Sequence, residues 1–470
     1  MSRLPHSPPS SNAALRLYSL CWWLGTPFAL LSLVWRARRQ RGYLSHIGER
    51  FGWVGKRRSD ARLLWVHAVS VGETRAAEPL IRAMATRWPD AEFLLTHMTP
   101  TGRDTGASVF ADLIKAGRMK QAWLAWDYPG ATRRMLERSR PSAGLILETE
   151  LWPNLVASAR SLHVPLGLVN ARLSEQSLRK GRRWAPLIRP ALAALDIVLA
   201  QTSRDAQRLS VLGRTDVSVT GNMKFDISPS ADTIAEGQRW RAALQTVLGC
   251  PRIIVAASTR DGEEALLLKA WGDIQRAFDP SLLPLFVLVP RHPQRFNEVA
   301  ELARATGFKV ARRSELVMAA LREEAMAALD GCNVLLGDSM GEMFTYYAMA
   351  DAAIIGGSLA PFGGQNLIEA CAAGLPVVIG PHTYNFEQAS ADAVAAGAAV
   401  RVPDAEQAIH VAMALVNDPA TLERARTAAL SFAEHHRGAT LRTINAVAAL
   451  LGDQTVQGDI DRDESKLAEL

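Results

Sequence analysis

Carboxylate side chains follow segments that we predict to be strands in the first half of the chain. Residues 62–67 (RLLWVH) run into Ser70, Gly72 and Glu73, and Glu73 stands where the next helix should begin. The positive end of a helix stabilises a carboxylate there, and a carboxylate so placed could take a proton from an attacking hydroxyl. It could also serve only as the helix cap, which is the simpler interpretation of this feature alone.

A second acidic group follows the predicted strand at residues 143–148 (AGLILE). Glu148 and Glu150 are separated by one residue, and Pro153 is suited to the first turn of the helix that follows. An unpaired charge at the end of a buried strand costs folding free energy, unless the charge has an oppositely charged partner or serves in binding or catalysis. An acidic helix start is also common, so this pair alone leaves catalysis and capping equally open.

Basic residues gather between positions 174 and 189, with no acid between Glu175 and Asp196. A solvated helix face is the usual explanation for such a run. The alternative is a dock for lipid phosphates, because each basic side chain near an anionic surface contributes about 1 kcal/mol. The candidates for this dock are Arg179, Lys180, Arg182 and Arg183. Lys224, in the segment GNMKFD (221–226), precedes a predicted linker and could face a cleft.

The second half of the chain presents turn residues that suit a phosphate. The predicted strand at 253–257 is followed by Ser258, and the one at 285–290 ends in Pro290, Arg291 and His292. A guanidinium binds phosphate oxygens in a planar fork, and a rigid turn after a buried strand would hold it in place. We therefore interpret Arg291 as a phosphate ligand.

Two further loops could hold a nucleotide. The segment SMGEM (339–343) opens a helix whose free backbone amides could bind a base or a phosphate. The segment GGQNLIE (363–369) places glycines before a helix that carries Glu369, a residue that could accept both ribose hydroxyls. A glycine-rich loop alone is a weak signal, and the Asn-x-x-Glu and Gly-x-Pro that follow make it stronger.

Metal or cofactor chemistry finds little support in the sequence. The Asp-x-Asp at 459–461 lies in a polar tail, and no His/Cys cluster has the spacing of metal ligands. A Walker or GxGxxG motif of the required form is also absent. The four cysteines are scattered without a CxxC pair, which suits a reducing compartment. We therefore expect neither a metal ion nor a cofactor.

Composition limits the class of protein without choosing a partner. Hydrophobic residues make up 48% of the chain and charged residues 21%, which is an ordinary globular balance that lets domains bury real cores. The net charge of +6 fits an anionic partner. It does not choose among nucleic acid, phospholipid and phosphorylated sugar.

An uncharged apolar run lies near the N-terminus. Residues 17–35 are just long enough to cross a bilayer as a helix, and Arg36, Arg38, Arg39 and Arg41 follow directly. By the positive-inside tendency, the bulk of the protein would then be cytoplasmic. The sequence GTP at 25–27 interrupts the run, so a helix lying in the interface rivals a full span, and a buried helix is a third alternative. A cleaved signal peptide is disfavoured, because arginines stand where the cleavage site should be.

Short apolar strands alternate with amphipathic helices along the rest of the chain. Strands are predicted at 62–67, 92–97, 121–126, 143–148, 165–170 and 196–200, and again at 253–257, 285–290, 308–312, 333–336, 352–357 and 376–380. This alternation predicts an α/β protein with two Rossmann-like domains, each a parallel sheet covered on both faces. Ligands bind such folds beyond the carboxyl ends of the strands, so we expect the chemistry in loops that line a shared cleft.

Together, the motifs resemble those of the 3-deoxy-D-manno-octulosonic acid (Kdo) transferase family of lipopolysaccharide biosynthesis. The matching segments are WVHAVSVGE (65–73), ETELWPN (148–154), NARLSEQS (170–177), TGNMKFD (220–226), AAST (256–259), PRHPQRF (290–296), MGEM (340–343), GGS (356–358) and GGQNLIEACAAGLPVVIGPHTYNF (363–386). They occur in order along most of the chain, which makes the set far more specific than any one member.

The resemblance implies a two-Rossmann (GT-B) glycosyltransferase that moves Kdo from CMP-β-Kdo to the distal glucosamine hydroxyl of a tetraacylated lipid A precursor, lipid IVA, with inversion and without metal. Glu73 matches the general base, while Glu148 and Lys224 match residues that support the transition state. Arg291 matches the donor-phosphate ligand. The matched CMP pocket comprises Pro290, Met340, Gly341, Glu342, Asn366 and Glu369, and we add Ser258, His292, Leu367 and Ile368 as donor-site candidates.

The resemblance also implies partners, a location and a domain plan. The partners are the CMP-Kdo donor, the lipid IVA acceptor and the inner membrane, with no nucleic acid, at the cytoplasmic face of the bacterial inner membrane. We expect a membrane anchor with its basic flank at 1–40, an acceptor domain at 41–226, a linker at 227–245, a CMP-sugar-binding domain at 246–451 and a disordered tail at 452–470.

Two alternatives remain open at the level of sequence. One is another enzyme of the same architecture, such as a UDP-sugar transferase or a nucleotide-sugar epimerase. The other is a non-catalytic protein of the membrane surface that binds lipid A phosphates through residues 179–189. The intact base and nucleotide motifs speak against the second.

Overall fold

The computed structural model describes residues 11–38, 40–226, 229–249, 252–279, 283–316, 329 and 331–453. The chain forms two compact units: Met1–Asp226 together with Arg437–Leu470, and Ile227–His436. Each unit is described by itself below. The Asp-x-Asp at 459–461 and most of the predicted disordered tail lie outside the described residues.

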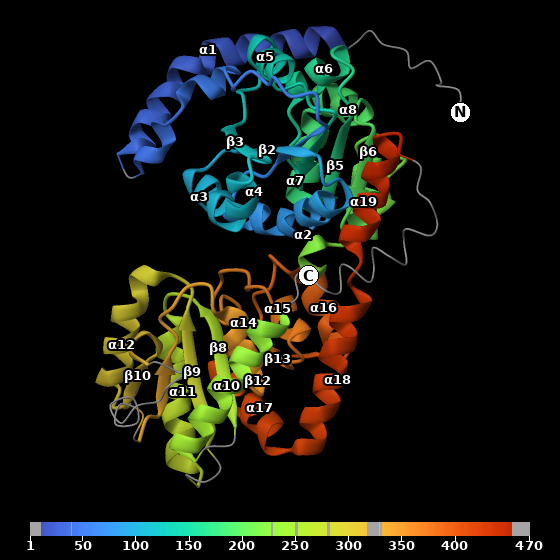
Figure 1. The fold of residues 1–470 in the computed structure, drawn as a ribbon. Helices are drawn as coiled ribbons and strands as arrows, with labels where there is room; N and C mark the ends of the chain where they lie inside the picture. Colours follow the sequence, from blue (N-terminus) through green and yellow to red (C-terminus); the bar gives the residue numbers. More distant parts are fainter. Residues whose placement is uncertain are drawn as a thin grey trace. The chain divides into compact units, whose positions relative to one another are not determined.

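A parallel sheet of seven described strands forms the centre of the first unit, in the order β3-β2-β1-β4-β5-β6-β7 (Figure 1). The strands are β1 (Leu63–His67), β2 (Glu92–His97), β3 (Met119–Trp123), β4 (Ala143–Leu147), β5 (Leu166–Ala171), β6 (Ile197–Ala200) and β7 (Ser218–Val219). Every residue of β1, β4 and β5 is buried, because helices cover both faces. The order places the topological switch point, where the chain changes its direction of travel, between β1 and β4.

Helices pack on both faces of this sheet. They are α1 (Ser11–Ala37), α2 (Val71–Arg87), α3 (Pro100–Val109), α4 (Ala111–Lys115), α5 (Pro129–Ser139), α6 (Pro153–Ser161), α7 (Glu175–Arg183), α8 (Ala185–Ala193), α9 (Ser203–Val211) and α19 (Ala439–Leu450), with the 3-10 segments η1 (Arg41–Leu44), η2 (Ile47–Phe51) and η3 (Met223–Asp226). One core contains residues of α2 and α19, and the other contains residues of α5, α6, α8 and α9.

The second unit repeats this architecture. Its sheet has the order β10-β11-β9-β8-β12-β13-β14, all parallel. The strands are β8 (Ile253–Thr259), β9 (Leu285–Pro290), β10 (Val310–Arg312), β11 (Val334–Leu336), β12 (Ala352–Ile355), β13 (Val377–Ile379) and β14 (Ala399–Arg401). The helices are α10 (Ala231–Leu248), α11 (Glu263–Ala277), α12 (Phe296–Ala305), α14 (Met343–Met349), α15 (Ile368–Ala372), α16 (Glu387–Ala395), α17 (Ala405–Asn417) and α18 (Pro419–His435), with η5 (Pro293–Arg295) and η6 (Arg313–Glu315). Here the switch point lies between β8 and β12.

The predicted α/β fold class is confirmed, and each of the twelve predicted strands overlaps an observed one. Strands β7 and β14 were not predicted. Both are short and lie at the edge of their sheets, and both residues of β7 and two of the three in β14 are exposed. A run of two or three residues with exposed side chains carries too little hydrophobic pattern to be recognised.

Two parts of the chain differ from the expected domain plan. The expected linker at 227–245 largely belongs to α10, which packs closely on α14 of the second unit: Gly237 lies against Ala348, and Arg241 pairs with Asp351 at 3.0 Å. The expected C-terminal domain at 246–451 ends earlier, because α19 belongs to the first unit. Asp226 accepts hydrogen bonds from the backbone amides of Gly438, at 2.7 Å, and of Thr440, and so holds the start of α19.

Helix α1 lies along the surface of the first unit, beside α5 and α6 (Figure 1). Ala13–Ala37 is long and apolar enough to cross a membrane, with a mean hydropathy of 1.5. One side packs: Trp22 contacts Trp126 and Trp152, and the Ser19 hydroxyl donates to Asn154 at 3.0 Å. The other side exposes large apolar residues, namely Leu17, Leu20, Trp23, Leu24, Phe28, Leu31, Val34 and Trp35. A fully buried helix is therefore excluded for α1.

Candidate active site

The predicted catalytic residues of the first unit come together at its switch point. Glu73 follows β1 and Glu148 follows β4, which are neighbours in the sheet, paired through Val66 and Leu145. Because parallel strands end at the same edge, their following loops share one site. Lys224 enters this site from η3, and its ammonium nitrogen lies 3.4 Å from Glu148 Oε1. The structure thus joins three residues that are far apart in sequence.

Glu73 lies in the first turn of α2, where it is half-buried. Its carboxylate accepts a hydrogen bond from the Val69 backbone amide at 2.9 Å and from the Ser70 hydroxyl at 3.0 Å. The residue therefore does cap its helix, as the simpler interpretation holds. A carboxylate has about four acceptor positions, so these two bonds leave room for an incoming hydroxyl.

Burial raises the pKa of Glu73 to about 7, and the charges of Glu148 and Glu150 raise it further against the two hydrogen bonds, which lower it. A carboxyl group with such a pKa exchanges protons near neutral pH, which is the property that a general base requires. An ordinary exposed cap would keep the pKa of a glutamate near 4.3. The raised pKa therefore sets Glu73 apart from an exposed helix cap.

Left-handed backbone conformations mark the strand ends of both units. Glu148 has a φ of 58°, Asn170 at the end of β5 has 51°, and Ser258 at the end of β8 has 58°. Non-glycine residues rarely adopt this region, and each such residue costs on the order of 1–3 kcal/mol. Strain of this kind tends to cluster at functional sites, which supports the assignment of these loops to the site.

Asn170 supports the segment that carries Lys224, a role that sequence reasoning missed. Its side-chain oxygen accepts a hydrogen bond from the Met223 amide at 3.1 Å, and Met223 itself is fully buried. Asn170 is also fully buried, and its side-chain nitrogen has no hydrogen-bond partner among the described residues. The signals in the sequence were the position of Asn170 at the end of a predicted strand and its place at the start of the matching segment NARLSEQS (170–177).

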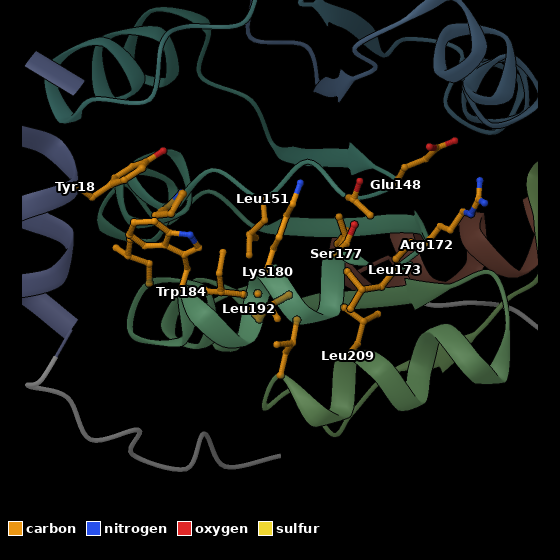
Figure 2. Close-up of a pocket in the computed structure, with 18 residues that line it drawn as sticks. Tyr18, Glu148, Leu151, Arg172, Leu173, Ser177, Lys180, Trp184, Leu192 and Leu209 are labelled. Carbon is orange, nitrogen blue, oxygen red and sulfur yellow. The ribbon is translucent and has the colours of Figure 1, made fainter. Parts of the chain in front are cut away.

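The four basic candidates on α7 are all exposed. Lys180 also lines a cavity of about 430 Å³ that reaches Glu148 (Figure 2). We call this cavity the leucine pocket, because its wall includes Leu151, Leu168, Leu173, Leu187, Leu192, Leu209 and Leu212. Of the four basic residues, Lys180 alone is found among those that line this pocket.

In the second unit, Ser258 and the glycines after β12 meet at the other switch point. A Cβ atom on Gly356 would collide with the carbonyl group of Ser258, so only glycine fits there. Ser258 is itself buried. The two backbones therefore approach closely, which glycine at position 356 permits.

Arg291 and His292 lie just beyond β9, on a turn held by the Arg291 amide, which donates to the Thr259 carbonyl at 3.0 Å. Partial desolvation and then the positive charges of Arg260, Arg291 and Arg295 lower the pKa of His292. This histidine is therefore neutral at physiological pH and surrounded by cations. Arg295 is neutralised by Asp261, Glu264 and Glu298, whereas Arg291 forms no ion pair with any residue in the described ranges. Its charge is available to an anion.

Glu263, at the start of α11, organises the glycine loop and was not among the predicted site residues. Its buried carboxylate accepts four backbone hydrogen bonds, from Arg260, Gly357, Leu359 and Ala360, at 2.6–3.1 Å. One side chain thus ties the loop after β8 to the loop after β12. The signal available in the sequence was the acidic pair that follows Gly262.

The Glu263→Gln substitution should loosen this loop, because the amide nitrogen of glutamine would face backbone donors that then lose their acceptor. We expect a loss of about 1.5–3 kcal/mol in the free energy of unfolding and weaker binding of CMP. Denaturant titration and calorimetry with CMP measure the two effects. Glu298→Gln, at an exposed residue that pairs with Arg295, is the matched control. Wild-type values for both quantities in Glu263→Gln would contradict the role.

The remaining donor candidates divide into exposed and buried ones. Met340 is 64% exposed, and Gly341 has a φ of 85°. Glu342 is held by Arg313 at 2.8 Å. Asn366, just before α15, accepts from the Ile368 amide at 3.1 Å, and its amide nitrogen donates to Glu369 at 2.9 Å. Pro290, Leu367 and Ile368 are buried, so the last two could contribute only through their backbone.

The charges of Arg291 and Glu369 both act on one buried residue of the second unit, Tyr347. Burial raises the pKa of Tyr347 well above its ordinary value; the charges of Glu369 and Cys371 also raise it, whereas that of Arg291 lowers it. Arg291 and Glu369 therefore both lie within the electrostatic surroundings of Tyr347. Across both units, the described residues contain no group of three or more His, Cys, Asp or Glu that could hold a metal ion.

Comparison with known proteins identifies the family. A family model described as 3-deoxy-D-manno-octulosonic-acid transferase matches residues 45–227, and one described as glycosyl transferases group 1 matches residues 318–432. A 3-deoxy-D-manno-octulosonic acid transferase of Bordetella pertussis is 47% identical over 90% of this chain and 97% of its own length. The chain belongs to the Kdo transferase family. A Kdo transferase of Haemophilus influenzae is 31% identical over 87% of this chain and 92% of its own length.

A solved structure agrees on the fold. A glycosyltransferase from Rickettsia africae superposes with a TM-score of 0.56, at 11% identity, over 84% of this chain and 100% of its own. The chain therefore shares the α/β fold of this glycosyltransferase. The membership of the family makes the chain a Kdo glycosyltransferase.

Proposed function

We propose that the chain transfers Kdo from CMP-β-Kdo to the distal glucosamine hydroxyl of lipid IVA, by direct displacement with inversion and without a metal ion. The observation that carries this proposal is the half-buried carboxylate of Glu73, whose pKa of about 7 suits it to take a proton from the acceptor hydroxyl. Removing that proton as the hydroxyl attacks makes the oxygen a stronger nucleophile, and one base facing the anomeric carbon favours a single displacement.

Lys224 and Glu148 support this step as a pair. The ammonium group of Lys224 is 3.4 Å from Glu148, and both side chains are about three-quarters buried. A cation held in place stabilises negative charge that develops during transfer, and it needs no reorganisation to do so. Glu148 would keep the ammonium group oriented, while its own charge keeps the pKa of Glu73 high.

The donor side requires charge compensation for one phosphate only. CMP leaves with a single phosphate group, and Arg291 supplies a guanidinium without an acidic partner in the described ranges. Arg260 and neutral His292 stand beside it. Fixed cations of this kind can offset the charge of the leaving group, which is the basis for proposing a reaction without metal. Asn366 and Glu369, linked to each other, would hold the ribose.

Donor and acceptor profiling tests the proposed reaction. Purified protein is incubated with tetraacylated lipid A precursor and with CMP-Kdo, generated in the reaction, or with UDP-sugars. The proposal predicts products heavier by whole Kdo residues, with CMP-Kdo alone as donor, in buffer containing a chelator. Turnover with UDP-sugars and none with CMP-Kdo would reject it in favour of another nucleotide-sugar enzyme.

We also propose that the protein sits at the cytoplasmic face of the inner membrane through α1, lying in the interface. The helix packs on its own unit through Trp22 and Ser19 while Leu24 and Phe28, 67% and 73% exposed, point away. A helix that is held along one side and apolar on the other suits an interfacial position better than a span. The arginines after residue 35 would meet anionic headgroups.

Placing charge on α1 should release the protein from membranes. Each large apolar side chain contributes about 1.5–3 kcal/mol when buried, so the double substitution Leu24→Glu and Phe28→Glu should lower partitioning more than about tenfold. Flotation with vesicles of phosphatidylethanolamine and phosphatidylglycerol measures it. Leu430→Glu, at a residue of α18 that is 51% exposed, is the control and should partition as the wild type does. If the double variant partitioned into vesicles as strongly as the wild type, α1 would not be the membrane anchor.

A further inference from the structure

The leucine pocket has a size and a lining that the transfer chemistry does not use. Its volume of about 430 Å³ falls in the range of small-ligand sites, roughly 300–1,000 Å³. Aliphatic side chains make up much of its lining, among them Leu173, Leu187, Ile188, Leu192, Leu209 and Leu212. They come from α8, from α9 with the residue after it, and from the loop that follows β5. A wall of this composition offers dispersion contacts and few hydrogen bonds, so it selects an alkyl chain over a sugar or a nucleotide.

The pocket runs from Glu148 toward α1, the helix proposed to lie in the membrane interface. Figure 2 shows Glu148 and Arg172 toward one end, and Tyr18 and Trp184 toward the other. Tyr18 belongs to α1, the helix with the exposed apolar face, and Trp184 between α7 and α8 is itself 60% exposed. An acyl chain whose tail lay beside Tyr18 and Trp184 would therefore have its polar end directed toward Glu148.

The positive charge beside the pocket favours an anionic lipid as the molecule that carries the bound alkyl chain. Lys180 lines the pocket and is exposed, so its charge can meet a headgroup at the surface. Lys180 is accompanied on α7 by Arg179, Arg182 and Arg183. Phosphate groups bind such cations, and a lipid that bears both phosphates and acyl chains would satisfy the pocket and α7 at once.

We propose that the leucine pocket binds one acyl chain of the lipid acceptor, with Lys180 pairing with a phosphate of the same molecule. This inference rests on the proposed function, because it takes the acceptor to be an acylated, phosphorylated glucosamine disaccharide. An acyl chain buried among residues of α8 and α9 would fix the position of the attached disaccharide relative to the catalytic residues. It would thereby determine which hydroxyl group reaches Glu73 and Glu148. The same site would then recognise the acyl chain and select the acceptor hydroxyl that receives Kdo.

Filling the pocket tests the proposal through acceptor selectivity. Ile188→Trp places an indole in the pocket from α8, and Ile188→Val is the matched control that leaves it open. With tetraacylated acceptor, Ile188→Trp should raise KM by about tenfold or more, since each lost methylene contact weakens binding. With the fully deacylated acceptor, wild type and Ile188→Trp should differ by less than about twofold.

The outcomes separate this proposal from the proposed function. Equal losses on both acceptors, or no loss on either, would overturn the pocket assignment while leaving the transfer reaction intact. Failure of the wild type to transfer Kdo to either acceptor would instead reject the proposed function. The melting temperature of each variant shows whether it is folded before kinetics are compared.

Photolabelling of the wild-type protein gives a second test, which does not depend on whether a substituted protein folds. Dodecanoic acid with a terminal diazirine is irradiated with the full-length protein, and the labelled peptides are sequenced. We expect label on α8 and α9, displaced by excess tetraacylated acceptor. Label confined to the exposed face of α1 would overturn the proposal. Displacement by phosphatidylethanolamine vesicles but not by acceptor would also overturn it, because the pocket would then hold a membrane phospholipid.

Discussion

Replacing Glu73 by glutamine should lower the rate of Kdo transfer by about 10²–10⁴-fold, which is the usual contribution of a general base. Glutamine keeps the size of the side chain: its carbonyl oxygen can still accept from the Val69 amide, while its NH2 group can donate to the Ser70 hydroxyl oxygen, so the start of α2 should remain folded. What it loses is the ability to take a proton. Turnover with CMP-Kdo and lipid IVA measures the change, and calorimetry should find the affinity for CMP unaltered.

Glu78→Gln is the control for this substitution. Glu78 lies on the same helix and pairs with Arg82 at 3.0 Å on the surface, away from the described catalytic residues. Its loss should leave turnover within about twofold, because an exposed i,i+4 pair contributes only a few tenths of a kcal/mol. If Glu73→Gln retained full activity, Glu73 would be a helix cap and nothing more.

The pH profile of the wild type should carry the signature of the same residue. A base acts only when deprotonated, and the pKa of Glu73 is raised to about 7, first by burial and then by Glu148 and Glu150. The value of kcat/KM should therefore be low below pH 6, rise through about pH 7 and level off above it. The Glu73→Gln protein should lose this limb of the profile.

Replacing Arg291 by alanine should weaken CMP binding by about 1.5–3 kcal/mol, which is about 10–150-fold in Kd, because a charge-assisted contact to the phosphate is lost. Arg291 forms no ion pair in the described part of the chain, so its removal leaves no unpaired acid behind. The loss should therefore appear in binding and not in folding. Calorimetric titration with CMP measures it directly.

Arg304→Ala provides the comparison for Arg291. Arg304 is an exposed residue of α12 in the same unit, beyond the turn that carries Arg291. The substitution removes one positive charge from the same unit and should leave the Kd for CMP unchanged. Equal effects of the two substitutions would mean that CMP responds only to the overall charge of the unit, and Arg291 would lose its assigned role.

Sequence patterns were sufficient for the parts of this protein that obey local rules. The strands β1, β4, β8 and β9 can be recognised in the sequence as continuous hydrophobic runs. The residues that follow them lie at the carboxyl edges of parallel sheets. Glu73, Glu148 and Arg291 could be selected on this basis alone. Their selection needed only the rule that ligands bind beyond strand ends at a switch point.

Features that depend on distant contacts were not predictable in the same way. The return of α19 to the first unit depends on Asp226, more than two hundred residues away in sequence, accepting bonds from Gly438 and Thr440. Glu263 looked like an ordinary acidic helix start, and only the fold brings the amides of Gly357, Leu359 and Ala360 to its carboxylate. Leu367 and Ile368 fell within a functional motif, yet their side chains fill the core.

The anomeric configuration of the product tests the central claim most directly. If Glu73 activates the acceptor hydroxyl for a single displacement at the anomeric carbon, a β-linked donor must give an α-linked product. Nuclear magnetic resonance of the Kdo–lipid product from CMP-β-Kdo should therefore show only the α linkage. A β-linked product would require two displacements or a different reacting face, and it would contradict the mechanism in which Glu73 is the base.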